Sequence, residues 1–209
     1  MFRDRRQAGE VLAGMLASFS ESGAQVLAIP AGGVPVALAV APALGLALDV
    51  APVSKITLPW NTEAGYGAVA FDGTVRLNRA LTEQLGLSDT TVGQGVARTT
   101  AKVRRRAERL RPGRPPLELA GRAAIVVDDG LASGFTMQVA VEALRGLGAE
   151  QIVVAVPTGH VDALERVSQA ADELYCANVR DGRRFAVADA YRQWDDVDEN
   201  GAARLLGVE

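Results

Sequence analysis

Two adjacent carboxylates, Asp128 and Asp129, follow an apolar run that ends at Val127. Small residues and hydroxyls come directly after them, in the order Gly130-Leu131-Ala132-Ser133-Gly134-Phe135-Thr136. Backbone N–H groups at such a turn, and at the start of a helix that follows it, have no intrahelical partner and attract an anion. The acids suit hydrogen-bond donors or a divalent cation instead. We therefore expect this stretch to bind a ribose 5-phosphate, with the carboxylates on the sugar hydroxyls and the turn on the phosphate.

Alternating strands and helices must position this stretch. Hydrophobic periodicity predicts helices at 8–19, 34–44, 136–147 and 162–170, and core strands at 26–29, 48–53, 122–127, 152–156 and 174–177. This alternation predicts an α/β fold with a mostly parallel central sheet and helices on both faces. Ligands of such sheets bind beyond the carboxyl ends of the strands, where Pro30, Lys55 and Asp128 are expected.

An insertion is expected between the second and third core strands. Residues 56–68 show no periodicity, so we expect a long mobile loop that serves as a lid. Asp72-Gly73 between two apolar runs predicts a β-hairpin, and a helical insertion at 79–116 is expected to hold helices near 79–84 and 90–110. We divide the chain into a core of residues 1–180, which includes the lid and the insertion, and a small C-terminal hood of residues 181–209.

Composition narrows the class of protein. The chain has 209 residues and a formal net charge of −3, which gives no overall attraction to nucleic acid. A single cysteine, Cys176, excludes an internal disulfide framework and suits a reducing cytoplasm. Prolines at 35, 42 and 52 interrupt the longest apolar stretch, and charged residues at the start are unlike a signal peptide. We expect a cytoplasmic protein with no membrane partner.

Val126 to Thr136 resembles the binding motif for 5-phosphoribosyl 1-pyrophosphate (PRPP) in the type I phosphoribosyltransferases, in which an apolar strand and two acids precede a G-x-A-T-G-x-T loop. Phe2-Arg3-Asp4-Arg5, Pro30 to Val36 and Pro59 to Val69 resemble parts of a group of predicted bacterial and archaeal members, whose substrate is generally unassigned. The resemblance implies a homodimeric enzyme that transfers phosphoribosyl from PRPP to a nitrogenous base with Mg²⁺ and releases pyrophosphate.

The resemblance also implies roles for individual residues. Asp128 and Asp129 would hold the ribose hydroxyls, with Asp129 reaching Mg²⁺ through water. Lys55 would approach the pyrophosphate. From its position alone, Glu63 is either an ordinary carboxylate of the lid or a proton acceptor. The 5′-phosphate and pyrophosphate sites would be formed by Gly130, Leu131, Ala132, Ser133, Gly134, Phe135 and Thr136, and by Ala31, Gly32 and Gly33, respectively.

Three departures from the family pattern bear on activity. Ala31 and Ser54 stand where relatives carry arginine, which removes two cations from the expected pyrophosphate site. Ala132 stands where the 6-oxopurine enzymes carry an aspartate base, which argues against hypoxanthine or guanine as the acceptor.

Two other functions remain open. A non-catalytic sensor of PRPP or nucleotides would explain the missing arginines, and it could bind RNA through the cluster Arg104, Arg105, Arg106, Arg109, Arg111 and Arg114, although alternation with Glu108 favours a solvated helix face. A phosphosugar hydrolase could use the same phosphate site. In the hood, Tyr191 or Phe185 is a candidate to stack on a planar base, and Trp194 is expected to pack.

Overall fold

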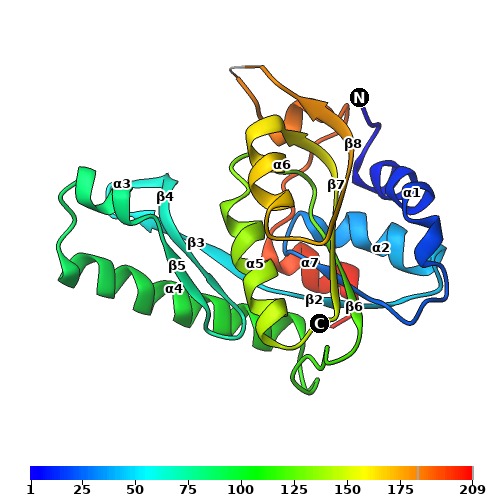
Figure 1. Ribbon diagram of the computed structural model, residues 1–209, viewed down its shortest axis with the longest axis horizontal. Coiled ribbons are helices and arrows are strands. Elements are labelled where there is room, and N and C mark those ends of the chain that lie inside the picture. The colour runs from blue at the N-terminus through cyan, green and yellow to red at the C-terminus, as the bar shows by residue number, and fades with distance from the viewer. Residues whose placement is uncertain (183, 209) are drawn as a thin grey trace.

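A five-stranded parallel sheet forms the centre of the protein (Figure 1). The computed structural model describes residues 1–182 and 184–208, and the side chains of Thr62 and Glu63 lie outside the described part. Each neighbouring pair of strands in this sheet is parallel. The strand order is β2 (Ala47–Val50), β1 (Gln25–Ala28), β6 (Ala123–Val127), β7 (Gln151–His160) and β8 (Glu173–Arg180).

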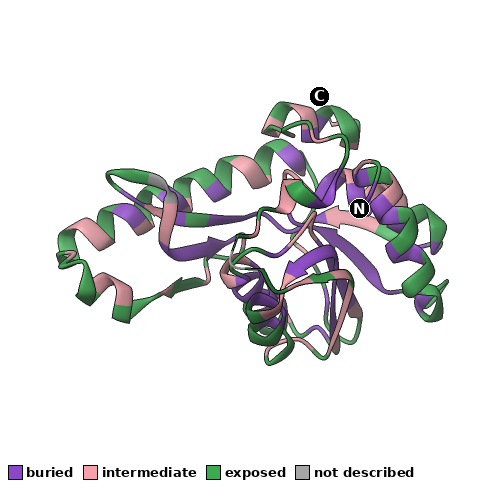
Figure 2. Cartoon of the chain, turned by 90° about the horizontal axis from the view of Figure 1, so that it is seen from above, coloured by how far each residue is buried: buried purple, intermediate pink, exposed green. Residues whose placement is uncertain are grey.

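Helices cover both faces of the sheet, as predicted. Alternate residues of the central strands point to opposite sides, so that Val126 packs with α5 (Phe135–Gly146) and α6 (Val161–Ser168). On the other face, Ile125 packs with α1 (Arg5–Met15) and α2 (Gly33–Ala43). The sheet is therefore buried between two helical layers, and Figure 2 shows its strands largely as buried residues. The predicted fold class and the order of core elements are confirmed.

An arm projects from one side of this core (Figure 1). It contains the antiparallel strands β3 (Val53–Leu58), β4 (Asn61–Ala70) and β5 (Val75–Leu77), followed by α3 (Arg79–Gln84) and α4 (Asp89–Leu110). The arm has its own apolar cluster, in which Ile56 and Tyr66 pack near Val103 of α4. The predicted hairpin at Asp72-Gly73 and both predicted helices are confirmed.

The expectation of an irregular loop over residues 56–68 is wrong, because β3 and β4 pair with each other across most of this segment. Two register shifts, at Ile56/Thr57 and Thr57/Leu58, and the glycines hid the strand alternation. The glycines are required by close packing: a Cβ at Gly65 would lie 2.2 Å from Lys55 Cγ, and one at Gly67 would lie 2.8 Å from the carbonyl oxygen of Arg76. Lys55 accordingly lies within β3 and not at the end of a core strand.

The N-terminal segment meets the tail of the chain near residue 190. After β8 the tail forms a 3-10 turn, η2 (Val187–Ala190), and then α7 (Glu199–Leu206), and a second 3-10 turn, η1 (Ala17–Phe19), follows α1. The N–H of Phe2 donates to the carbonyl of Ala190 (2.7 Å), and the N–H of Arg192 donates to the carbonyl of Phe2 (2.9 Å). Within the described residues, every helix is too short or too polar to cross a membrane.

Candidate functional site

The predicted phosphate-binding stretch forms a cradle, residues 128–136, between the end of β6 and the start of α5. An extension of β7 holds this loop in place: the N–H of Leu131 donates to the carbonyl of Thr158 (2.9 Å), and the N–H of His160 donates to the carbonyl of Leu131 (3.0 Å). Gly134 precedes the helix with φ of 71°, and a Cβ there would lie 2.9 Å from the carbonyl oxygen of Ala163. Glycine is therefore required at this position.

A cavity of about 190 Å³ opens within the cradle. Its walls bring together Asp128, the cradle loop and Lys55, three features that the sequence analysis placed at one site. Val187 of η2 forms another wall, and a Cβ at Gly130 would lie 2.6 Å from Val187 Cγ1, so glycine lets the loop pass close beneath the tail. The lining residues are Lys55, Asp128, Gly130, Leu131, Ala132, Ser133, Gly134, Thr136, Met137 and Val187.

The two acids have different surroundings. Asp128 lines the cavity, and its Oδ1 accepts a hydrogen bond from the N–H of Asp129 (2.8 Å). Asp129 Oδ2 accepts a hydrogen bond from Nε of Arg5 (2.9 Å) and forms an ion pair with Nη2, at 2.8 Å. Burial, together with the adjacent Asp129 carboxylate, raises the pKa of Asp128 well above its usual range. Burial also raises the pKa of Asp129, although the Arg5 guanidinium opposes that shift.

The turn expected to bind pyrophosphate, Pro30 to Gly33, lies directly against the acids. A Cβ at Gly32 would fall 2.1 Å from Asp129 Oδ2, and one at Gly33 would fall 2.6 Å from the carbonyl oxygen of Val127. Both glycines therefore allow the turn to approach the end of β6. The peptide bond between Pro30 and Ala31 is cis, and Ala31 packs at the edge of the apolar cluster under α2.

Two contributors were missed by sequence reasoning. Arg5, at the start of α1, is a buried cation that reaches Asp129, and Val187 of the tail closes one side of the cavity. The motif from Phe2 to Arg5 singled out Arg5 in the sequence. The spacing of residues could not show that Arg5 contacts Asp129 or that Val187 lines the cavity. The predicted proton acceptor Glu63 has its side chain outside the described residues.

The aromatic residues of the tail pack and support the acids. Tyr191 is 6% exposed, which contradicts a stacking role on a base, and its hydroxyl donates to the backbone carbonyl of Asp129 (2.6 Å). The packing role expected of Trp194 is confirmed by its contact with the Tyr191 ring, at 5.3 Å between centroids. Phe185 lies edge-on to His160, at 6.0 Å between centroids, and base stacking by Phe185 stays a prediction.

The arginine cluster on and after α4 is partly engaged in ion pairs. Arg106 contacts Glu199 of α7 (3.1 Å), while Arg111 and Arg114 contact Asp49 of β2, at 2.8 and 3.3 Å. These pairs join the end of the arm to the core. They favour a structural role for these three cations over RNA binding.

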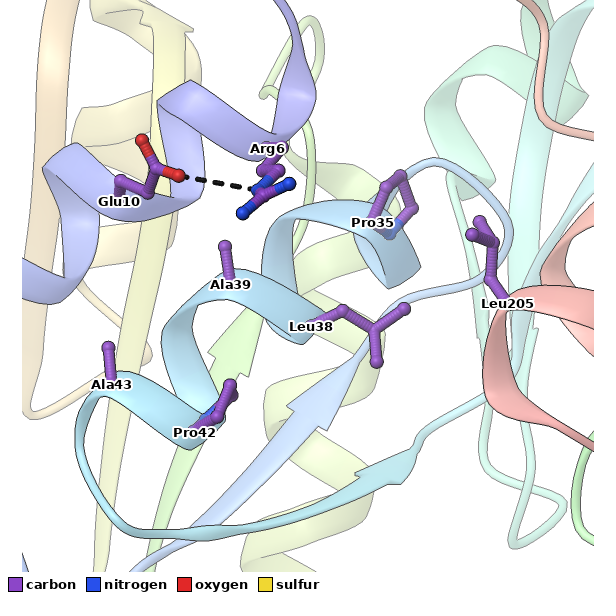
Figure 3. Close-up of a pocket in the computed structure, with 8 residues that line it drawn as sticks. All are labelled: Arg6, Glu10, Pro35, Leu38, Ala39, Pro42, Ala43 and Leu205. Atoms are coloured by element: carbon purple, nitrogen blue, oxygen red, sulfur yellow. Dashed lines mark ion pairs between the residues drawn. The ribbon is translucent and has the colours of Figure 1, made fainter.

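A larger hollow, of about 450 Å³, lies away from the acids (Figure 3). Pro35, Leu38 and Pro42 of α2 line it together with Leu205 of α7. Its polar contribution is the exposed ion pair between Arg6 and Glu10, at 3.4 Å. This apolar groove contains none of the residues predicted to do chemistry, so we place the functional site at the cradle.

Comparison with known proteins assigns the chain to a family. The model of the phosphoribosyl transferase domain family matches residues 6–188, so the chain belongs to the phosphoribosyl transferase family. A Mycobacterium tuberculosis protein, provisionally named a phosphoribosyl transferase, is 37% identical over 206 residues, which are 99% of this chain and 46% of the relative. The chain thus spans about half the length of the curated relatives that it matches in this way.

Solved structures confirm the fold. The crystal structure of a Thermus thermophilus protein is 36% identical and has a TM-score of 0.80, covering 99% of this chain and 97% of that one. A hypoxanthine phosphoribosyltransferase of Staphylococcus aureus has a TM-score of 0.50 over 85% of this chain and 73% of that one. Its identity of 11% shows a shared fold alone.

Proposed function

We propose that this protein transfers the 5-phosphoribosyl group of PRPP to a nitrogenous base and releases pyrophosphate. The observation that carries the proposal is the cavity at the end of β6, where the cradle loop, the Asp128 carboxyl group and Lys55 meet. This set of groups matches the three parts of PRPP: a terminal phosphate, a sugar with vicinal hydroxyls, and a diphosphate.

The 5′-phosphate would occupy the cradle. Backbone N–H groups at the start of α5 and the positive end of its dipole favour an anion there. Thr136 supplies a hydroxyl in the cavity wall, and Ser133 supplies another, whose Oγ accepts a long hydrogen bond (3.4 Å) from the N–H of Phe135. Because the loop is already held by β7, binding would need little reorganisation of the backbone.

Asp128 would accept hydrogen bonds from the ribose hydroxyls, and Lys55 would lie near the diphosphate. In the reaction the bond between C1 of ribose and the pyrophosphate oxygen breaks, a nitrogen of the base bonds to C1, and the base loses a proton. Positive charge develops on the ribose ring as pyrophosphate leaves, and the nearby Asp128 carboxyl group, once ionised, stabilises it. The cavity walls, Val187 among them, would exclude water that could hydrolyse PRPP.

The residues at the site fit a Mg²⁺ ion that arrives with the substrate. No cluster of three or more His, Cys, Asp or Glu side chains that could hold a metal occurs among the described residues. Mg²⁺ commonly binds through one or two carboxylates, waters and substrate phosphates, which is compatible with this pair of acids. Since Asp129 is paired with Arg5, we propose Asp128 as the residue nearer the ion, in place of the Asp129 contact that the resemblance implies. Bound Mg²⁺ would neutralise charge on the leaving pyrophosphate.

The proposal is tested by supplying PRPP and Mg²⁺ with a broad panel of purine, pyrimidine and other nitrogenous acceptors, and measuring pyrophosphate. We expect release that depends on one class of acceptor and is lost in the Asp128→Asn variant. PRPP binding without turnover would favour the non-catalytic sensor, and release of ribose 5-phosphate without an acceptor would favour the hydrolase. Absence of PRPP binding would contradict the transferase and a sensor of PRPP.

We also propose that the protein acts as a homodimer in the cytoplasm, as the family resemblance implies. Light scattering after size-exclusion chromatography would give the mass directly. A mass near that of one chain at working concentration would contradict the dimer.

A further inference from the structure

Arg5 is a buried cation fixed by two hydrogen bonds and an ion pair. Its side chain is 9% exposed, Nε donates to Oδ2 of Asp129 (2.9 Å), and Nη2 lies 2.8 Å from the same oxygen. Nη1 donates to the backbone carbonyl of Asp195 in the tail, at 2.7 Å. The planar guanidinium presents its N–H groups in a rigid fork, so these partners determine its orientation. Arg5 therefore connects the start of the chain, the acid pair and the tail.

Aromatic rings enclose the same guanidinium. Its central carbon lies 3.7 Å from the centroid of Trp194 and 5.9 Å from that of Tyr191. The negative face of an aromatic ring attracts such a desolvated cation. Tyr191 in turn donates its hydroxyl to the carbonyl of Asp129 (2.6 Å). We name Arg5, Asp129, Tyr191, Trp194 and Asp195 the Arg5 clamp.

Close packing of α1 on α2 sets the position of Arg5. A Cβ at Gly9 would lie 2.4 Å from the carbonyl oxygen of Val36, so glycine allows the two helices to cross at short distance. Because α2 begins at Gly33, the first turn of α1 lies near the turn that precedes α2. Asp129 is thus held between Arg5 on one side and Gly32 on the other.

We propose that Arg5 is a positioning residue of the phosphoribosyl site: it holds the Asp129 carboxylate against the Gly32 turn and leaves Asp128 as the acid that faces the cavity. The proposal rests on the proposed function. It also places a cation beside a pyrophosphate turn that lacks the arginine expected at Ala31.

Removal of Arg5 should release the Asp129 side chain. Arg5 from α1 contacts the Asp129 carboxylate, and Asp128 of the same loop and Tyr191 of the tail contact its backbone. Without the guanidinium, the carboxylate loses its ion pair at 2.8 Å and is no longer held against the Gly32 turn. PRPP affinity should therefore fall although no contact with the ligand has been removed.

The test compares Arg5→Gln, Arg5→Lys and a matched control, Arg6→Gln, whose side chain is 81% exposed on the same helix. Calorimetry would measure PRPP affinity in the presence of Mg²⁺. We expect Arg5→Gln to lose affinity, Arg5→Lys to recover part of that loss because it restores a cation beside Asp129, and Arg6→Gln to match the wild type. Arg5→Gln should add no further loss to an Asp129→Asn variant, because both act through one carboxylate.

A second readout needs no ligand. In a crystal structure of Arg5→Gln the Asp129 carboxyl group should have turned away from the Gly32 turn, whereas in Arg6→Gln it should stay there. Unchanged PRPP affinity in Arg5→Gln while the wild type binds, a loss that Arg5→Lys does not reduce, or an Asp129 side chain that stays at the Gly32 turn in Arg5→Gln would overturn this proposal alone. Failure of the wild-type protein to bind PRPP would overturn the proposed function, and this proposal with it.

Discussion

The cradle and the Arg5 clamp meet at two adjacent aspartates but are constructed in opposite ways. The cradle is one continuous segment, from Asp128 to Thr136, set between a strand and a helix. The clamp joins residue 5 to residue 129 and to residues 191–195, from both ends of the chain. The cradle can therefore be recognised from one short stretch of sequence. The Arg5 clamp, which holds Asp129 in place, depends on tertiary packing.

The two halves also differ in charge. Asp128 faces a cavity next to Lys55, and its burial disfavours the ionised form in the absence of a ligand. Asp129 faces a buried guanidinium that favours the ionised form. Adjacent acids with such different surroundings suit different tasks. We therefore propose that Asp128 contacts the ligand and that Asp129 has a structural, electrostatic role.

The largest expected effect concerns the cradle. Asp128→Asn should lower PRPP affinity on the order of 10- to 100-fold, since hydrogen bonds to a charged group contribute about 1.5–3 kcal/mol. The amide retains an oxygen for the N–H of Asp129, so the loop should stay in place. Isothermal titration calorimetry checks the affinity, with the exposed Asp196→Asn as the control. Equal affinity in the two variants would show that the cavity does not hold the sugar.

A glycine substitution in the cradle should lower stability more than a glycine substitution elsewhere in α5. Gly134→Ala should lower the free energy of unfolding by about 1–2 kcal/mol, because φ there is 71° and the added Cβ meets a carbonyl oxygen. Gly146→Ala, at the other end of α5, has no atom within 4 Å of its added Cβ and should be neutral or stabilising. Urea denaturation measures both. The same stability loss for the two variants would contradict the loop geometry.

Loss of a single hydrogen bond in the Arg5 clamp should lower stability by less than the glycine substitution in the cradle. Tyr191→Phe removes the hydroxyl that donates to the Asp129 carbonyl, and we expect a loss of about 1 kcal/mol in stability. Thermal unfolding and PRPP affinity should be measured together. A loss of affinity as large as that of Asp128→Asn would mean that the clamp contacts the ligand, and the distinction between the two halves would fail.

The smallest expected effect is a pH dependence of stability caused by Asp128. Below the ordinary aspartate pKa, about 3.9, this carboxyl group is protonated in the folded and unfolded states alike. Between that pH and its raised folded pKa, the unfolded chain ionises more readily, so the folded protein loses stability as the pH rises. Asp128→Asn should therefore gain stability relative to the wild type across this window. Thermal unfolding over a pH series checks the sign, and a difference that shrinks as the pH rises would contradict it.

Much of the cradle and the sheet was accessible from sequence because the signals are local. The apolar strand Ala123–Val127, the two acids and the glycine that begins α5 act through neighbours in the chain. The strand Val53–Leu58 and the first part of Asn61–Ala70 were missed because register shifts interrupt their pairing. In addition, Gly65 and Gly67 are required by close packing against Lys55 and Arg76 of the neighbouring strands.

The Arg5 clamp could not be predicted from sequence because its contacts join segments that are far apart in the chain. Arg5 reads as one of several surface charges near the start of the chain, and its burial depends on the crossing of α1 with α2 and on the tail. Tyr191 could be assigned either to packing or to a ligand until its hydroxyl was located on the Asp129 carbonyl. A contact among three distant segments leaves no periodic or spacing signal in any of them.

The central claim is that the bend after β6 binds a phosphorylated sugar and that Asp128 contacts its hydroxyls. A crystal structure with PRPP and Mg²⁺ tests it most directly. We predict the 5′-phosphate on the backbone of residues 130–136, a ribose hydroxyl on the Asp128 carboxylate, and Asp129 still paired with Arg5. Phosphate density elsewhere, or Asp128 turned from the sugar while the ligand is bound, would contradict the account.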